Sequence, residues 1–285
     1  MPERSALLGV DLGGTRVRVG RISNKKLERI ESALINARGS EEEVLSQISG
    51  LISAFDIGSV AGIGVGAPSV VDVEKGIVYD TVNIPSWKEV HLREKLQRRF
   101  GVPVRVNNDA NCFALGERAF GKGRGFRNMV GLIVGTGLGA GILFDNRLCI
   151  GANCGAGEFG MVAYRDSNYE HYCSGQFFTG VKGIAGEELF ERAVRGDRAA
   201  MEIFEEFGRH LGEAVKMIMY TVDPEIIVLG GSVSRALRFF QEPVWEALDD
   251  FAYPQSIKKL RIEASELEHV GVLGAAALFY EADEL

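Results

Sequence analysis

Two glycine-rich segments of this chain are suited to binding phosphate. The first covers residues 11–15 (Asp-Leu-Gly-Gly-Thr) and the second residues 135–141 (Gly-Thr-Gly-Leu-Gly-Ala-Gly), each directly between two aliphatic runs. Glycine permits positive φ and lets backbone N–H groups approach an anion closely. Because an aliphatic run resumes at once, both segments are predicted to be hairpin tips rather than strand-to-helix phosphate loops. A plain tight turn is the alternative for either segment alone, but the pair favours a polyphosphate held by two turns. The candidate phosphate-binding residues are Gly13, Gly14, Thr15, Gly135, Thr136, Gly137 and Gly139.

Asp109 is the residue best suited to act as a general base. It stands where the strand-like run 104–106 gives way to a helical pattern that continues to about residue 120. A side chain at such a junction points into the crevice at the carboxyl ends of the strands. Phosphoryl transfer to an alcohol needs a carboxylate that orients the hydroxyl and accepts its proton. The structural alternative is helix capping, because Asp and Asn are favoured N-caps.

Four further places carry polar groups or glycines in suggestive positions. Asp11 precedes the first glycine turn and is a candidate for holding Mg²⁺ through a water molecule, with an Asx-type turn as the alternative. Glu158 and Glu170 are carboxylates of the kind that accept hydrogen bonds from sugar hydroxyls, although a single acid is more often a solvated surface group. Gly230-Gly231-Ser232 follows a strand-like run and would let adenine or ribose lie against the backbone, unless it is only a turn.

Composition and charge exclude several classes of protein. The chain has 285 residues, 46% hydrophobic and 25% charged, which supports one large or two modest globular domains. A net charge of −7 argues against a nucleic-acid partner, and no apolar run is long enough for a membrane span. We expect a cytoplasmic protein, because the N-terminus enters a strand almost at once and leaves no room for a signal peptide. Four cysteines without C-x-x-C spacing are expected to be reduced thiols, namely Cys112, Cys149, Cys154 and Cys173.

The pattern of strands and helices predicts an α/β protein of two lobes. A strand, a glycine hairpin and a second strand open each lobe, so the second lobe echoes the first without repeating its sequence. We expect an N-terminal lobe at 1–120, joined by a C-terminal helix at about 268–285, and a second lobe at 121–267. Helices are predicted at about 41–52, 89–100 and 109–120, then from about 185 to 220.

Taken together, these motifs resemble those of the ROK family of sugar kinases and repressors, within the actin-like/sugar-kinase superfamily. The segments 11–15 and 135–141 look like the family's two phosphate loops, and 223–231 is similar to its adenosine-side strand and turn. The resemblance covers nearly the whole chain. It implies two actin-like (ribonuclease H-like) lobes with a cleft for nucleotide and sugar between them. It also implies ATP as the phosphoryl donor, with Mg²⁺ as its counter-ion. By the same resemblance Asp109 is the base, and the implied sugar contacts are Asn83, Asn108, Asp109, Glu158 and Glu170.

The chain departs from the family pattern at one place. The family usually has a histidine where this chain has Met161, followed by a cysteine-rich zinc loop, whereas residues 162–169 contain no cysteine. Methionine cannot replace an imidazole as a hydrogen-bond donor or as a zinc ligand. We therefore predict no structural zinc site. The identity of the sugar is left open as well, and His171 is a candidate to replace the missing imidazole.

The resemblance implies an ATP-dependent hexose kinase that phosphorylates the 6-hydroxyl of a sugar, with glucose as the first expectation. An N-acetylhexosamine (N-acetylglucosamine or N-acetylmannosamine) or fructose is the alternative substrate. A non-catalytic sugar-sensing regulator is a distant alternative, since only residues 1–5 precede the first strand and would have to hold a DNA-binding segment. A homodimer is one open possibility for the assembly.

Overall fold

The structure is a computed structural model that describes residues 5–280, and these residues fold as two compact units. The first unit comprises residues 5–125, 141–156 and 266–280, and the second comprises residues 126–140 and 157–265. The chain forms two five-stranded sheets, one for each unit.

The first unit is built on a mixed five-stranded sheet of order β3-β2-β1-β4-β8. The strands β1 (Ala6–Leu12), β2 (Arg16–Ser23) and β3 (Lys26–Leu34) form an antiparallel meander, and β4 (Val60–Ala67) and β8 (Val104–Asn108) add in parallel. The β2–β3 connection is the pair Asn24-Lys25, both at positive φ (50° and 57°), as a two-residue hairpin of type I′ requires. Parallel pairing places the carboxyl ends of β1, β4 and β8 at one edge of this sheet.

Helices of the first unit begin and end at recognisable signals. A capping box between Ser40 and Glu43 starts α1 (Glu41–Ile52), and Gly101 at φ +65° ends α2 (Leu92–Phe100). α3 (Asp109–Phe120) follows β8 directly. The remaining short elements are η1 (Ile57–Ser59), β5 (Val71–Asp72), β6 (Ile77–Tyr79) and β7 (Glu89–Val90), the last three forming a small antiparallel sheet.

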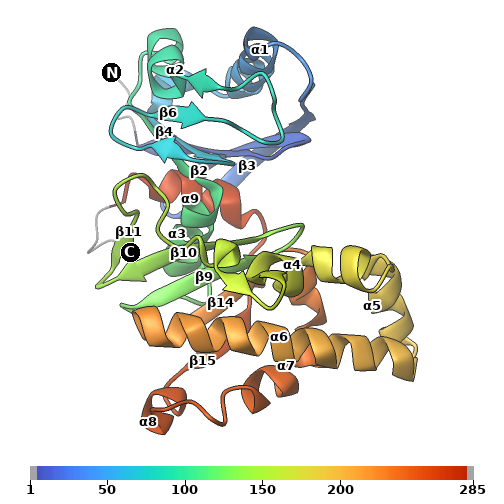
Figure 1. Ribbon diagram of the computed structural model, residues 1–285. Coiled ribbons are helices and arrows are strands. Elements are labelled where there is room, and N and C mark those ends of the chain that lie inside the picture. Colours follow the sequence, from blue (N-terminus) through green and yellow to red (C-terminus); the bar gives the residue numbers. More distant parts are fainter. Residues whose placement is uncertain (1–4, 281–285) are drawn as a thin grey trace. The chain divides into compact units, whose positions relative to one another are not determined.

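Helix α9 (Val270–Ala277) lies directly on the first sheet and against α3 (Figure 1). A Cβ atom at Gly64 of β4 would lie 1.7 Å from the carbonyl oxygen of Ala275, and one at Gly9 of β1 would lie 1.9 Å from that of Val272. A Cβ at Gly274 would similarly lie 1.6 Å from the carbonyl oxygen of Cys112 in α3. These glycines allow backbone-to-backbone approach, so the helix is fixed beside the strand ends that carry the candidate site.

The second unit repeats the strand order of the first. Its sheet has the order β11-β10-β9-β14-β15, with β9 (Met129–Val134), β10 (Leu138–Phe144), β11 (Arg147–Cys149), β14 (Ile226–Gly230) and β15 (Arg261–Ala264). β14 pairs in parallel with both β9 and β15. The end of β10 from Gly141 onward, with β11, belongs to the first unit. The echo expected from the two strand–glycine–strand openings is thus a repeated topology, and the α/β fold class is confirmed.

The second unit buries an aromatic core beneath its long helix. α6 (Arg198–Val222) runs along the sheet (Figure 1), and it packs with α4 (Tyr169–Cys173), α5 (Gly186–Val194) and α7 (Leu237–Glu246). Five phenylalanines are fully or almost fully buried among these elements: Phe177, Phe178, Phe204, Phe207 and Phe240. Short elements complete the unit: η2 (Phe159–Met161), β12 (Ala163–Tyr164), β13 (Ser167–Asn168), η3 (Phe177–Val181), η4 (Val233–Ala236) and α8 (Pro254–Ile257).

Several predicted helices differ in their bounds. The helices expected over about 185–220 are α5 and α6, which Gly196 at φ +83° separates, and α6 continues to Val222. The helix expected from residue 89 begins at Leu92, since Glu89 and Val90 form β7 instead. Residues 281–285 of the predicted C-terminal helix lie outside the described part. Within residues 5–280, no helix combines the length and the apolar character that a bilayer span demands.

Candidate active site

The first glycine turn is a tight β1–β2 connection that contacts a predicted sugar-binding residue. The amide of Gly13 donates to the carbonyl of Arg16 at 2.9 Å, which closes the turn. A Cβ atom at Gly14 would lie 2.7 Å from Cβ of Asn83, so only glycine lets this side chain lie against the turn. Thr15 and Asn83 are both exposed. The structure therefore brings Gly13, Gly14 and Thr15 together with Asn83 in one unit.

Asp11 lies near the end of β1 rather than in an Asx turn. Its Oδ2 forms an ion pair with Nη1 of Arg18 on the neighbouring strand at 3.1 Å. A Cβ atom at Gly271, in the first turn of α9, would lie 2.9 Å from the carboxyl carbon of Asp11. Burial raises the pKa of Asp11, while the charges of Arg18 and His269 oppose that rise. This acid is therefore held between a cation and the first turn of α9.

Asp109 is the first residue of α3, and the cap of that helix is its neighbour. Asn108 adopts an extended conformation, and its Oδ1 accepts the amide of Ala110 at 2.8 Å. Oδ1 of Asp109 also accepts that amide at 2.9 Å. Nδ2 of Asn108 donates to the carbonyl of Ser69 at 3.1 Å, and Ser69 has the unusual φ of +101°. Both residues are half-buried at the carboxyl end of β8.

A buried carboxamide network behind this junction was missed at the level of sequence. Oδ1 of Asn107 accepts the amide of Asn108 at 2.8 Å and Nδ2 of Asn111 at 2.9 Å. It also accepts the thiol of Cys154 at 3.3 Å. Asn107 lies in β8 and Asn111 in the first turn of α3, so no helical spacing in the sequence indicates their contact.

The second glycine turn is held by the segment that follows α4. The amide of Gly135 donates to the carbonyl of Gly137 at 3.0 Å, and the carbonyl of Gly135 accepts the amide of Gly175 at 2.7 Å. The hydroxyl of Ser174 donates to the carbonyl of Thr136 at 3.2 Å. Thr136 is exposed at the tip of the turn. These hydrogen bonds hold the shape of the turn, and Gly139 follows in β10.

Glu170 contacts this turn directly. Its Oε2 accepts the amide of Leu138 at 3.0 Å, and its Oε1 accepts Nε2 of Gln176 at 3.0 Å. A Cβ atom at Gly137 would lie 2.6 Å from Oε2 of Glu170, so glycine is required beside the carboxylate. Glu158 directly precedes η2 and is exposed. Partial desolvation raises the pKa of Glu158, and the negative charge of Glu170 adds to that rise. The two predicted sugar-binding acids of this unit are therefore electrostatically coupled.

The third glycine segment packs beside the second turn. Gly231 follows β14 at φ +82°, and a Cβ atom there would lie 2.4 Å from the carbonyl oxygen of Val134 and 3.0 Å from the amide nitrogen of Gly135. The hydroxyl of Ser234 donates to the carbonyl of Gly231 at 2.8 Å. Gly230 is buried and Ser232 is exposed. The predicted adenosine-side turn and the predicted phosphate turn are thus adjacent at one end of the second sheet.

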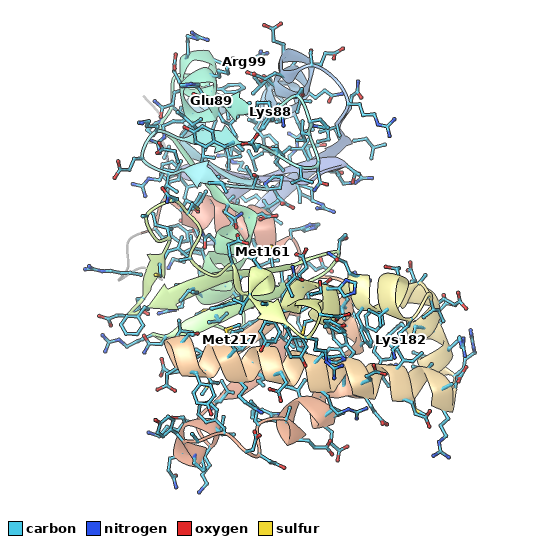
Figure 2. The ribbon with its side chains drawn as sticks, in the orientation of Figure 1. Lys88, Glu89, Arg99, Met161, Lys182 and Met217 are labelled. Carbon is cyan, nitrogen blue, oxygen red and sulfur yellow. The ribbon has the colours of Figure 1, made fainter. Side chains whose placement is uncertain are left out.

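An aromatic hairpin follows Met161 at the position where the family pattern has its zinc loop. Met161, labelled in Figure 2, is 53% exposed. In the β12–β13 hairpin the ring of Tyr164 stacks on Tyr169 at 4.4 Å, and its hydroxyl lies 3.1 Å from Nδ1 of the buried His210. His171 packs edge-on against Tyr172 at 5.1 Å. Among the described residues, no three His, Cys, Asp or Glu side chains come together in a group that could hold a metal ion.

Two units with one strand order, each carrying a glycine turn between its first two strands, define an actin-like α/β protein. The ROK family model matches residues 7–282, and the chain belongs to the ROK family. It is 32% identical over 312 residues to a glucokinase of Thermotoga maritima, covering 96% of this chain and 97% of that protein.

Two further relatives show the range of the family around this chain. An N-acetyl-D-glucosamine kinase of Photobacterium profundum is 29% identical over 299 residues, covering 95% of this chain and 98% of that protein. The solved structure of a ROK family glucokinase from Streptomyces griseus in complex with glucose and AMPPNP aligns with a TM-score of 0.80 at 27% identity. That alignment covers 96% of this chain and 99% of the other.

Proposed function

We propose that this chain is an ATP-dependent hexose kinase that transfers the γ-phosphoryl group of ATP to the 6-hydroxyl of a sugar, with glucose as the expected substrate. Membership of the ROK family and the near full-length match to a glucokinase support this assignment. The single observation that carries it is the placement of Asp109 and Asn108 at the carboxyl end of β8, in a chain related over its whole length to sugar kinases.

Asp109 acts as the general base in this proposal. It orients the 6-hydroxyl and accepts its proton while the oxygen attacks the γ-phosphorus in line. The new bond joins that oxygen to phosphorus, the bond to the β–γ bridging oxygen breaks, and ADP leaves with the electron pair. A half-buried carboxylate at the start of α3 suits this task, because the helix N-terminus favours its ionised form.

The sugar is bound by hydrogen-bonding side chains. Asn83 and Asn108 offer carboxamides that both donate and accept, and Glu158 and Glu170 offer acceptors for hydroxyl groups. Gln176 orients Glu170 through the bond at 3.0 Å and so belongs to the same set.

The triphosphate is bound by backbone amides of the two glycine turns, and the nucleoside lies near Gly230, Gly231 and Ser232. The hydroxyls of Thr15 and Thr136 are additional donors, because both residues are exposed at the tips of their turns. Mg²⁺, held by Asp11 through a water molecule, would neutralise phosphate charge. A single carboxylate fits that role, since Mg²⁺ in kinase sites is usually held by one or two carboxylates together with substrate phosphates and waters. If Asp11 holds Mg²⁺ in this way, Asp11→Asn should raise the Mg²⁺ concentration needed for half-maximal activity.

An N-acetylhexosamine kinase is the second candidate, and the match to an N-acetyl-D-glucosamine kinase favours it. Fructose is a third substrate to test, and a regulator without activity is the remaining alternative. A cytoplasmic location and a homodimer are further parts of the proposal, to be tested by fractionation and by light scattering.

A coupled assay of ADP release decides among these functions. Glucose, mannose, fructose, N-acetylglucosamine and N-acetylmannosamine are compared at equal ATP and Mg²⁺, and phosphorus NMR of the product identifies the phosphorylated carbon. Asp109→Asn is the test variant, and we expect kcat to fall by about 10²-fold or more. Exposed Asp249→Asn on the second unit is the matched control. Sugar-dependent ADP release that survives Asp109→Asn would refute the assigned base, and no release with any sugar would refute the kinase.

A further inference from the structure

Cys154 adopts a backbone conformation that cysteine rarely takes. It lies in the loop between β11 and η2 with φ +57°, in the left-handed region that favours glycine. Its side chain is nevertheless buried, with 7% of the residue exposed. A disfavoured backbone around a buried side chain is commonly found where that side chain has a specific task.

The thiol of Cys154 is hydrogen-bonded to the carboxamides of two residues that flank the candidate base in the sequence. Sγ donates to Oδ1 of Asn107 at 3.3 Å, and Nδ2 of Asn111 donates to Sγ at 3.4 Å. The same Nδ2 donates to Oδ1 of Asn107 at 2.9 Å, which closes a three-membered network. Oδ1 of Asn111 is buried and has no hydrogen-bond partner among the described residues. The orientation of this carboxamide therefore depends on what its Nδ2 contacts.

The network contacts Asn108, which precedes the proposed base Asp109. Oδ1 of Asn107 accepts the backbone amide of Asn108 at 2.8 Å, and Asn108 is the cap of the helix whose first residue is Asp109. A shift of the Asn107 carboxamide moves that amide and changes the direction of the following side chains. All these residues lie in the first unit.

We propose that Cys154 is a positioning residue, whose thiol fixes the carboxamides of Asn107 and Asn111 and through them the placement of Asn108 and Asp109. The inference rests on the proposed kinase function and deepens it, because it adds a residue that lies 45 positions after the base, in the loop between β11 and η2. It also explains why the loop accepts a strained cysteine, since a glycine at this position would lack the thiol.

Three substitutions separate positioning from simple stability. Cys154→Ser keeps the left-handed strain and a hydrogen-bonding group, Cys154→Ala keeps the strain without that group, and Cys154→Gly removes both. We expect the serine variant to retain kcat/KM for glucose within about twofold, and the alanine and glycine variants to lose about fivefold to tenfold, the effect of one modest hydrogen bond. The loss should fall on kcat and on KM for sugar, with KM for ATP unchanged.

The melting temperatures give the independent comparison. Glycine relieves the strain, so Cys154→Gly should melt no lower than Cys154→Ala while being equally impaired in catalysis. Activity that instead follows melting temperature across the three variants would show a purely structural residue and overturn the inference. Cys149→Ala, on the exposed cysteine of β11, is the control expected to behave as the natural chain.

A thiol-labelling experiment tests the contact without relying on catalysis. Iodoacetamide is added to the folded chain, and the modification of each cysteine is followed by peptide mass spectrometry. Cys149 should react first and Cys154 slowly, and Asn111→Ala should speed the reaction of Cys154 by about fivefold, because one of its bonds is lost. Equal reactivity of Cys149 and Cys154 in the natural chain would refute the buried network. A chain that phosphorylates no hexose refutes the proposed function instead, and this labelling then decides whether the network exists.

Discussion

Glu170 accepts a hydrogen bond from the backbone amide of Leu138 at 3.0 Å, so a carboxylate assigned to the sugar also supports the second glycine turn. The two residues are 32 positions apart, and the contact joins the first turn of α4 to the start of β10. One side chain thereby connects the proposed sugar site with the turn proposed to bind the triphosphate. This relationship makes Glu170 the position at which sugar and nucleotide binding can be separated by substitution.

Glu170→Gln and Glu170→Ala should have different effects. Glutamine keeps a carbonyl acceptor for the Leu138 amide but lacks the charge, so KM for the sugar should rise by about tenfold while KM for ATP stays unchanged. Alanine removes the acceptor as well, and both KM values should rise. Steady-state kinetics with each substrate varied in turn measure the difference.

Glu242→Gln, on an exposed glutamate of α7, is the matched control for these variants. An equal rise of KM for ATP in Glu170→Gln and Glu170→Ala would contradict the role of the Leu138 bond.

The acid limb of the pH profile should report Glu158. Partial desolvation and the charge of Glu170 raise the pKa of Glu158, and only the ionised carboxylate accepts hydrogen bonds with both oxygens. As the pH falls through this raised pKa, kcat/KM for the sugar should decline. Glu170→Gln removes the like charge, so the decline should move to lower pH, and Glu158→Gln should remove it. A limb that keeps its position in both variants would assign it to another group.

Much of the fold was predictable, because its signals are local. The glycine turns, the helix start after Asn108 and the repeated strand–turn–strand openings are all carried by neighbouring residues in the chain. Hydrophobic alternation and turn chemistry are sufficient to identify such elements. The repeat of one strand order in both units then follows from two similar openings, since few topologies accommodate them.

The contacts that shape the candidate site were not predictable, because they join distant segments. Nothing local in the sequence indicates that Cys154 bonds to Asn107, 47 positions earlier, or that Glu170 reaches the Leu138 amide. The start of a helix at residue 89 was a wrong expectation for a related reason. Pairing of Glu89 and Val90 with β6 outweighs their place in an amphipathic pattern.

The close approach of α9 to the first sheet gives a prediction about stability. A Cβ atom at Gly64 would lie 1.7 Å from the carbonyl oxygen of Ala275, and backbone atoms on both sides leave little room to adjust. Gly64→Ala should therefore lower the free energy of unfolding by about 3 kcal/mol, the upper part of the usual range for an overpacked core. Urea unfolding followed by circular dichroism measures the change.

Gly50 in α1 supplies the control for that substitution. A Cβ atom there would meet nothing within 4 Å, so Gly50→Ala should raise the free energy of unfolding by about 0.5–1 kcal/mol, the helix preference of alanine. A destabilisation by Gly50→Ala equal to that of Gly64→Ala would show that contact with α9 is not the cause.

The buried histidine beside the aromatic hairpin predicts that the free energy of unfolding depends on pH. His210 is buried beneath Tyr164, and burial lowers its pKa, assisted by the charge of Arg165 and opposed by Glu206. Glu206 also pairs at 2.6 Å with Lys182, which is labelled in Figure 2. As the pH falls, this histidine takes up a proton at a higher pH in the unfolded chain than in the folded chain. The stabilisation is therefore fully present above the ordinary histidine pKa, and it declines as the pH falls from there toward the lowered pKa of the folded chain.

Urea unfolding at several pH values between about 7.5 and 5.5, spanning the ordinary histidine range, tests this term. His210→Gln cannot titrate and should flatten the decline, although it should lower stability at every pH because Tyr164 loses an edge-on ring contact and Tyr172 a tilted one. A decline that keeps the same slope in His210→Gln would show that the buried pair of Tyr164 and His210 does not set the pH dependence.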